Sequence, residues 1–568
     1  MKMPRKSVTD LLHIVKKFDD DSIAKLPKDS RKFLNMPKTP QKFEVQDMAP
    51  GNFVYFGIDF NLKRRDIENE LLEESEIKLT INIDGKPLFS NSKVEFWLIL
   101  GRVKHKVFII AIYSGKKKPY CVESFLYDFV EEVNELSENG VLVKGRVLPF
   151  SLYCILADAP AKAYILQVKG HTGYSSCTKC EVDGDNIDRR MSFLDLDANR
   201  RTNESFRTQE DFDFHTGDSP LVKIEYFDMV KDIPLDFLHL INLGIMKKML
   251  GYMTGPGPLE ARLGSAGVSA INVKIQSINK FCPSEFQRSI PRTLEDLCFW
   301  RGHEFGQFVM YSGTFAVDGI VGEKQFILFS TLQIIIRLLC ENQIDDDTLA
   351  YVEQLCRKFV VDFADFYGQQ YVSHNVHNLI HLVDDVRRFG NLYNFSCYPF
   401  ESFLGTDVDS MILSGNQPLM QAMNKYLIQM TTSTDTKEVE KTNTKISIKN
   451  LPPEYQKCIF YSKFYTKDYV LSTLRDGDKY FALRDCHKII KISHIFEDEH
   501  GLMHTSGHAF DEIHDFFSQP CSSQVAGIFL VKKLNDAKCF KWRLDDIKHK
   551  MYLLPREQST FVAIKLQH

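Results

Sequence analysis

Three β-patterned segments between residues 77 and 115 constrain the fold of this chain more than any other feature. Apolar residues alternate with polar ones or run on unbroken in IKLTINIDGKPLFS, in VEFWLILGRV and in HKVFIIAIYSG, a pattern typical of β-strands. A segment with helical spacing, VESFLYDFVEEVNELSENG, follows and ends at Gly140. The apolar run VLPFSLYCIL then leads into Ala-Asp-Ala-Pro and a helix of small residues. The predicted order is therefore β-β-β-α-β-α.

That order predicts the first part of a ribonuclease-H-like core, in which three antiparallel strands are followed by a helix and by a strand parallel to the first. Asp84 lies on the first strand and Asp158 at the end of the fourth. Because these strands are neighbours in such a sheet, we expect the two carboxylates to converge on Mg²⁺, which prefers oxygen ligands. Structural interpretations stand beside this one: Asp84 begins an Asp-Gly pair typical of hairpin turns, and Asp158 precedes a helix that it could cap.

Two pairs of residues far apart in the chain have zinc-binding chemistry. Cys177 and Cys180 form a C-x2-C motif in a glycine-bounded turn, which is half of a tetrahedral site. His377 and His381 are four residues apart, so a helix would present both imidazoles on one face. Together they predict a Cys2His2 zinc site. The alternatives are a pair of unligated turn thiols or a redox pair that lacks the usual strand-to-helix setting, and two histidines that are ordinary core or surface residues.

A third carboxylate, Glu401, follows His381 by twenty residues and lies in Tyr-Pro-Phe-Glu, where Pro399 favours the start of a helix. Three other polar residues compete for an active-site role. Asp236 and His239 lie near the start of an amphipathic helix, and we interpret them as a helix cap and a core histidine. Glu304 is interpreted as a solvated helix residue.

The composition bounds the class of protein. The chain has 568 residues with 44% hydrophobic content and a formal net charge of −4, so it is globular and has no overall basic character. Local basic segments are residues 1–44, with eleven Lys or Arg against six Asp or Glu, and the run Lys116–Lys118. The thirteen cysteines are scattered and no signal peptide or long apolar run is evident, which favours a reducing intracellular compartment and no membrane span.

These patterns divide the chain into six predicted parts. They are a basic N-terminal arm and helix (1–75), which could contact a phosphate backbone or pack as a solvated leader, the first part of the core with the C-x2-C motif (76–184), a mostly helical insertion (185–370), the end of the core with the histidine pair and the third acid (371–430), a polar linker (431–450), and a small β-rich domain (451–568).

The order of these motifs resembles that of transposases of the CACTA group, within the CACTA/Mirage/Chapaev superfamily and particularly its animal branch. The resemblance covers roughly residues 10 to 568 and depends on Asp84 in NIDG, Asp158 in LADAPA, the Cys177/Cys180 pair, Asp236 and His239 in LDFLHL, the His377/His381 pair and Glu401 in YPFE. More remotely, the chain is similar to the catalytic core of the V(D)J recombinase. A zinc-finger pattern, often present at the N-terminus of related transposases, does not precede Asp84.

The resemblance implies a DDE-type polynucleotidyl transferase. Asp84, Asp158 and Glu401 would bind two Mg²⁺ or Mn²⁺ ions and catalyse cleavage of DNA ends and strand transfer, whereas the Cys177, Cys180, His377 and His381 set would bind structural zinc. Implied partners are transposon ends and target DNA in the nucleus, bound by a homo-oligomer. Two alternatives stay open, namely a domesticated, transposase-derived protein that binds DNA or chromatin without cutting it, and a zinc-stabilised interaction protein.

Overall fold

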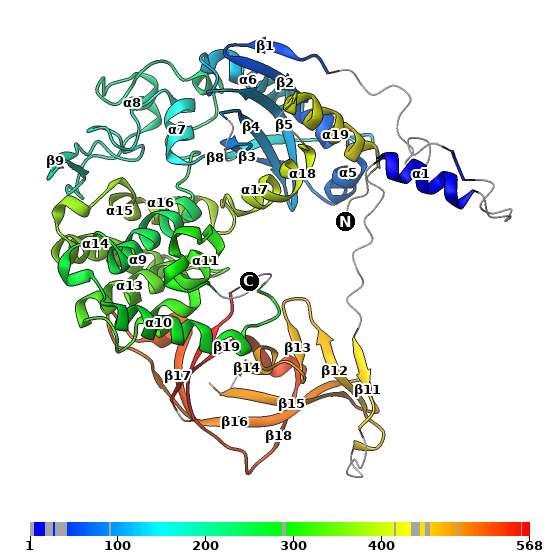
Figure 1. Ribbon diagram of the computed structural model, residues 1–568, viewed down its shortest axis with the longest axis vertical. Helices are drawn as coiled ribbons and strands as arrows, with labels where there is room; N and C mark the ends of the chain where they lie inside the picture. The colour runs from blue at the N-terminus through cyan, green and yellow to red at the C-terminus, as the bar shows by residue number, and fades with distance from the viewer. Residues whose placement is uncertain are drawn as a thin grey trace. The chain divides into compact units, whose positions relative to one another are not determined.

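The computed structural model describes residues 5–16, 26–28, 43–89, 93–286, 291–413, 416–432, 443–448, 455–484, 488–557 and 559–567 (Figure 1). The chain divides into two compact units. The first unit contains Met1–His171, Thr202–Pro234 and Cys397–Glu438, and the second contains Thr172–Arg201, Leu235–Ser396 and Val439–His568. Each unit is therefore assembled from segments that are distant in sequence.

The predicted N-terminal helix is present as α1 (Arg5–Val15). Most of the basic arm that follows it falls on residues 17–25 and 29–42, which lie outside the described residues. The same holds for much of the linker predicted over 431–450, of which Thr444–Ile446 forms strand β11. The twelve cysteines in the described part of the chain all carry free thiols.

A six-stranded mixed sheet forms the centre of the first unit, with strand order β1-β2-β5-β4-β3-β8. The three strands predicted first are present as an antiparallel meander, and the fourth, β8, pairs parallel to the first. Their bounds are β1 (Gln46–Met48), β2 (Gly51–Tyr55), β3 (Ile77–Pro87), β4 (Glu95–Val103), β5 (Lys106–Gly115) and β8 (Phe150–Leu156). The predicted α/β class and the order β-β-β-α-β are confirmed.

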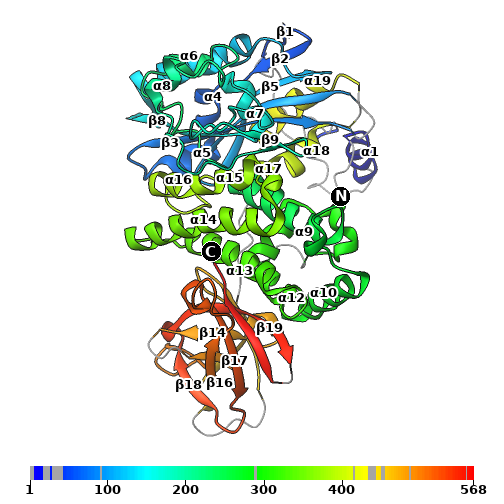
Figure 2. The same ribbon diagram turned by 90° about the vertical axis from the view of Figure 1, so that its left-hand side faces the viewer.

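Helix α6 (Val122–Asn139) connects β5 to β8 and covers one face of the sheet (Figure 2). Its buried residues recur every three or four positions from Val122 to Leu136, which gives the helix one apolar side. It ends at Gly140, whose φ of 71° is accessible to glycine at little cost and lets its N–H bond to the Leu136 carbonyl. A short hairpin, β6 (Val141–Val143) and β7 (Arg146–Leu148), precedes β8.

The two faces of strand β3 contact different layers. Ile81 and Ile83 belong to the apolar core that includes residues of α6 and of α7 (Ala159–Leu166). Asn82, on the alternate face, instead contacts Cys397 just before α17 (Tyr398–Phe403). On that second side Tyr426 of α19 (Pro418–Thr432) accepts the Ile109 N–H at 2.9 Å. The sheet is thus enclosed between an early and a late segment of the chain.

The second unit combines a helical body with a C-terminal β-barrel. Its longest helices are α13 (Glu323–Leu339) and α14 (Asp346–Tyr367), which pack as a hairpin. The other α-helices of the body are α9 (Lys247–Thr254), α10 (Ser265–Ser277), α11 (Gly302–Gln307), α12 (Gly313–Val317), α15 (His374–Asn378) and α16 (Leu382–Phe389). The predicted helical middle region is confirmed. No helix in the described ranges is long and apolar enough to cross a membrane.

The barrel closes because β15 pairs with β16 in addition to β14. The resulting ring contains β14 (Tyr480–Leu483), β15 (Ile489–Glu497), β16 (Met503–Asp515), β17 (Ile528–Leu534), β20 (Thr560–Lys565) and β19 (Ile547–Glu557). Strands β11, β12 (Ile459–Tyr465), β13 (Val470–Ser472) and β18 (Phe540–Arg543) extend this sheet. Closure removes the open edges that a flat sheet of this size would expose to other chains. The expected β-rich domain is therefore a barrel.

Arg337 of α13 joins the barrel to the helical body. Its side chain has no exposed surface and donates hydrogen bonds to the carbonyls of Ala526, Lys565 and Met310 at 2.7, 2.8 and 3.0 Å. Two of these carbonyls belong to the barrel. A guanidinium suits this position because its planar fork places several N–H donors in fixed directions.

We expect Arg337→Met to lower the free energy of unfolding of the second unit by about 2–4 kcal/mol, because buried carbonyls would lose their donors. The control is Arg387→Met, which removes a half-exposed ion pair with Glu353 and should cost less than about 1 kcal/mol. Urea denaturation followed by intrinsic fluorescence measures both values. Equal losses for the two variants would contradict the proposed role of Arg337.

Candidate functional site

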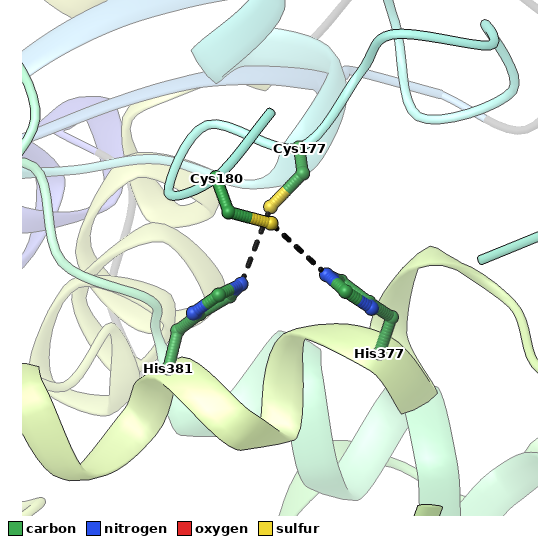
Figure 3. Close-up of side chains that lie close together, drawn as sticks. All are labelled: Cys177, Cys180, His377 and His381. Atoms are coloured by element: carbon green, nitrogen blue, oxygen red, sulfur yellow. Dashed lines mark hydrogen bonds between the residues drawn. The ribbon is translucent and has the colours of Figure 1, made fainter. Parts of the chain in front are cut away.

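Cys177, Cys180, His377 and His381 lie together in the second unit, as predicted from their spacing. The Cys180 sulfur is 3.3 Å from Nε2 of His377, and the Cys177 sulfur is 3.5 Å from Nε2 of His381 (Figure 3). All four side chains are buried, and their ligand atoms lie within 4.8 Å of one another. The cluster can bind a metal such as zinc.

The distances fit a tetrahedral ion. Zinc–sulfur and zinc–nitrogen bonds of about 2.3 and 2.0 Å at tetrahedral angles require sulfur–nitrogen separations of about 3.5 Å. The two thiol–imidazole distances of 3.3 and 3.5 Å match this separation. The donor set, two sulfurs and two imidazole nitrogens, is also one that structural zinc sites use.

The histidine pair lies on a less regular helix than the sequence predicts. Helix α15 ends at Asn378, a 3-10 turn follows over Leu379–His381, and α16 begins at Leu382. The two imidazole rings nevertheless lie side by side, with centroids 5.3 Å apart. The one-turn spacing therefore keeps both rings on the side that faces the thiols.

The Nδ1 atoms of His377 and His381 are buried and have no hydrogen-bond partner in the described part of the chain. A histidine that binds a metal through Nε2 carries its proton on Nδ1 and usually donates it to a carboxylate or carbonyl. Here the hydrogen bonds of the two rings within the described residues involve Nε2 only, and packing, such as that of His377 on Phe193, contributes the rest of their orientation. We therefore expect the ring positions to depend on a bound metal.

The neighbouring charges favour ionisation of one thiol. Burial raises the pKa of the Cys177 thiol. Hydrogen bonds from Cys180 and His377 lower this pKa by more than burial raises it, so the pKa lies well below the usual value. The hydrogen bond to Cys177, together with burial, raises the pKa of Cys180. Because a thiolate is the form of cysteine that binds metals, a cation between the two sulfurs would stabilise the ionised form of both.

A buried ion pair holds the cysteine turn on the helix behind the histidines. The Lys179 ammonium lies 2.7 Å from Asp385 of α16, and both side chains are almost fully buried. The second oxygen of Asp385 accepts the Leu235 N–H at 2.7 Å. Arg201 also donates to the Cys177 carbonyl at 2.9 Å. Several contacts therefore position the thiols, and no local sequence pattern indicates any of these partners.

The carboxylates Asp84 and Asp158 lie at the same end of two neighbouring parallel strands of the first unit, Asp84 within β3 and Asp158 two residues beyond β8. The described β3–β8 pairing ends with Asn82 opposite Leu156, and each aspartate follows its strand residue by two positions. Asp84 is still within β3, paired with Leu98 of β4. The hairpin-turn interpretation of the Asp-Gly pair is therefore wrong, because both residues belong to the sheet.

Asp158 also caps a helix, as its alternative interpretation expects. Its Oδ1 accepts the Ala161 N–H at 2.7 Å in the first turn of α7. A carboxylate has a second oxygen with lone pairs that can serve a metal ion. The capping bond fixes the direction of the side chain, so the structural and the metal-binding roles are compatible.

Glu401 lies in the first turn of α17, after Pro399, as predicted. The Glu401 N–H bonds to the Cys397 carbonyl at 2.9 Å, and the Cys397 sulfur is 3.6 Å from Nδ2 of Asn82. Asn82 and Asp84 lie on the same face of β3 because side chains alternate along a strand. The helix that carries Glu401 is thus attached to the face of β3 that carries Asp84.

The three carboxylates do not form a single tight cluster like the cysteine–histidine set. Among the described residues, Asp84, Asp158 and Glu401 are not a group whose ligand atoms all lie within 4.8 Å of one another. A site with two ions about 3.5–4 Å apart does not require this, since acids that bind different ions can be farther apart.

The other polar candidates have structural partners. Asp236 accepts the His239 backbone N–H at 3.0 Å and contacts its ring Nδ1 at 2.7 Å. Glu304 is buried rather than solvated and bonds to Arg292 and to the Arg301 N–H, and these bonds hold its pKa at about 2. The capping interpretation of Asp236 is confirmed.

Asn82 and Cys397 were not predicted, although the polar alternation Thr80, Asn82, Asp84 within an apolar strand was a usable signal.

Comparison with known proteins adds two findings. The model of a family described as a domain of unknown function (DUF8592) matches residues 441–566, which include the barrel. The solved Drosophila P element transposase strand transfer complex matches with 10% sequence identity over 77% of this chain and 93% of that chain, at a TM-score of 0.34. A score this low supports no statement about fold or function. No curated protein sequence matches the chain.

Proposed function

We propose that the chain is a DDE transposase-like polynucleotidyl transferase, similar to the CACTA group, which cuts DNA ends and transfers them to target DNA. The observation that carries the proposal is the β3–β8 register, which ends with Asn82 opposite Leu156, two residues before Asp84 in β3 and two before Asp158, just beyond β8. Glu401 supplies the third acid from a helix attached to β3 through Cys397 and Asn82. A sheet of this topology, with these acids, is what a ribonuclease-H-like core requires.

The three acids would hold the metal in this mechanism. Asp84, within the β3–β4 ladder, would bind Mg²⁺ or Mn²⁺ together with Asp158 and Glu401. Bound there, the ions would supply activation of the attacking hydroxyl and stabilisation of the leaving oxygen of the phosphodiester. The chain itself fixes the spacing of the acids through the sheet register, the Asp158 helix cap and the Asn82–Cys397 contact.

The zinc centre has a structural role in this proposal. Its cysteines follow Asp158 in the sequence and its histidines precede Glu401. A bound zinc ion would therefore join the two segments of chain on either side of the helical insertion, with no part in the chemistry. Closed four-ligand sites of this kind contribute to folding rather than to catalysis.

The test combines metal binding with DNA cleavage. We expect the purified chain to bind about two Mn²⁺ ions in addition to its zinc, as measured by titration calorimetry, and to nick supercoiled plasmid DNA in Mn²⁺ or Mg²⁺ but not in EDTA. Mn²⁺ binding is a useful measure because it does not require knowledge of the recognised DNA end. DNA binding with neither Mn²⁺ binding nor nicking would favour the alternative, a transposase-derived protein that binds DNA without cutting it.

A further inference from the structure

The three consecutive lysines Lys116–Lys118 lie on a turn that is fixed to the first unit. All three side chains are exposed. The hydroxyl of Tyr113 donates to the Lys117 carbonyl at 2.9 Å, and the hydroxyl of Tyr164 donates to the Pro119 carbonyl at 2.9 Å. These bonds hold the backbone, so the lysines are presented from a defined position.

The turn is at the same end of the sheet as the proposed catalytic acids. Pro87 at the end of β3 pairs with Glu95, which pairs with Gly115 at the end of β5. Strands β3 and β5 therefore run in the same direction, and β8 is parallel to β3. The chain beyond β5, which begins with Lys116, consequently leaves the sheet at the end where Asp84 and Asp158 lie.

A series of contacts connects this turn to Gly85, the residue after Asp84, on the face of the sheet opposite the Asp84 side chain. The ring of Trp97 lies directly over Gly85, where a Cβ would come within 2.8 Å of Cε2 of the indole. Trp97 packs edge-to-face on Tyr164 with ring centroids 5.1 Å apart, and the Lys118 ammonium lies 4.6 Å from the Tyr164 ring centroid. The basic turn and the backbone next to Asp84 are thus parts of one packed structure.

Lys116–Lys118 differ from the other lysines at the ends of the sheet, since even at the acid end Lys86 pairs with Asp409 at 3.0 Å. At the opposite end, Lys104, Lys106 and Lys78 each form an ion pair, with Glu74, Glu70 and Glu76 at 2.6, 3.5 and 3.7 Å. None of the described ion pairs involves Lys116, Lys117 or Lys118. Three like charges therefore lie side by side at the acid end, where no carboxylate of the described residues neutralises them.

We propose that Lys116, Lys117 and Lys118 bind the phosphate backbone of DNA beside the catalytic acids and so position the strand to be cut. This inference rests on the proposed function and names a substrate-positioning surface for it. Gly115 and Asp84 are two strands and about three residues apart, which is on the order of 14 Å at the usual sheet spacings. A DNA duplex covers that length in about four base-pair steps.

The experiment measures DNA binding without catalysis. A fluorescein-labelled duplex of arbitrary sequence is titrated with the full chain in Ca²⁺, and anisotropy gives the dissociation constant between 50 and 300 mM salt. We expect the triple variant K116Q/K117Q/K118Q to reduce the slope of log K against log salt by about 2 to 3, because each lost phosphate contact removes about 0.9. The matched control is K78Q/K104Q/K106Q, which also removes three positive charges but at the opposite end of the sheet.

The outcomes separate this inference from the proposed function. A reduced slope for the first triple variant and an unchanged slope for the control support the inference, whether or not the wild-type chain cuts DNA. Equal effects of the two triple variants, or no binding of DNA by the wild-type chain, overturn it. If the chain binds DNA through these lysines but shows no metal-dependent nicking, the proposed catalysis fails and the binding surface stands.

Discussion

Cys177→Ser should reduce the zinc content of the purified chain from about one ion to nearly none and destabilise the second unit. Cys177 is fully buried, and its sulfur lies 3.5 Å from Nε2 of His381. A serine hydroxyl is a poor zinc ligand, and the three remaining side chains cannot complete a tetrahedral site. Because the free energy of binding a structural zinc is also folding free energy, we expect a loss of about 3 kcal/mol or more.

The two histidine rings explain why this loss should be large. Nδ1 of His377 and Nδ1 of His381 are buried without a partner in the described part of the chain, so no second hydrogen bond would keep the rings in place after the metal leaves. Adding a chelator such as phenanthroline to the wild-type protein should lower its thermal midpoint by a similar amount. Plasma mass spectrometry measures the metal, and differential scanning calorimetry measures the midpoint.

The control variant is Cys298→Ser, which changes an exposed thiol of the same unit and should keep both the zinc and the midpoint. Full zinc content in Cys177→Ser would show that this ligand set is wrong. Loss of zinc from Cys177→Ser without a change in its thermal midpoint would show that the cluster binds metal but does not stabilise the fold.

The sequence predicted those features whose signals lie close together in the chain. Apolar runs of strand length, interrupted in β3 only by the polar alternation at Thr80, Asn82 and Asp84, predicted β3, β4, β5 and β8, since strands covered on both faces are rich in apolar residues. Residue spacing predicted the cysteine–histidine cluster, because each segment supplies two residues with metal-ligand chemistry. The helix that carries the histidines was also predicted, but not the 3-10 turn over Leu379–His381 within it.

The remaining features depend on contacts between residues that are distant in sequence. Asn82 and Cys397 are 315 positions apart, and nothing local to either residue indicates the contact. The same is true of the Lys179–Asp385 pair, which spans 206 positions. The interpretation of Glu304 as a solvated residue was wrong for a related reason, since its partner Arg292 lies beyond the helix that carries it. From sequence alone a charged residue is predicted to be exposed, unless the oppositely charged residue that pairs with it is known.

Asp84→Asn should reduce metal-dependent nicking of DNA by about three orders of magnitude or more. Asparagine keeps the shape of the side chain and its acceptor for the Gly85 N–H, which Asp84 Oδ1 accepts at 2.7 Å, but it removes the negative charge. A tenfold change in rate corresponds to 1.36 kcal/mol in the activation free energy, and the metal ions held by such acids contribute several kcal/mol. Glu401→Gln should have an effect of similar size.

A specific loss of charge at the site must be distinguished from a loss of structure. Asp213→Asn is the matched control, because Asp213 belongs to the same unit and its side chain is 90% exposed in an ion pair with Lys169. We expect wild-type nicking by this control and a wild-type thermal midpoint for all three variants, because the side chains of Asp84 in β3 and Glu401 in α17 are only half-buried and do not belong to the apolar core. Mn²⁺ titration should show weakened binding in Asp84→Asn and Glu401→Gln only. If both variants nick DNA at the wild-type rate, these acids are not the catalytic ones. The β3–β8 pairing would then serve the fold of the sheet and would not form an active site.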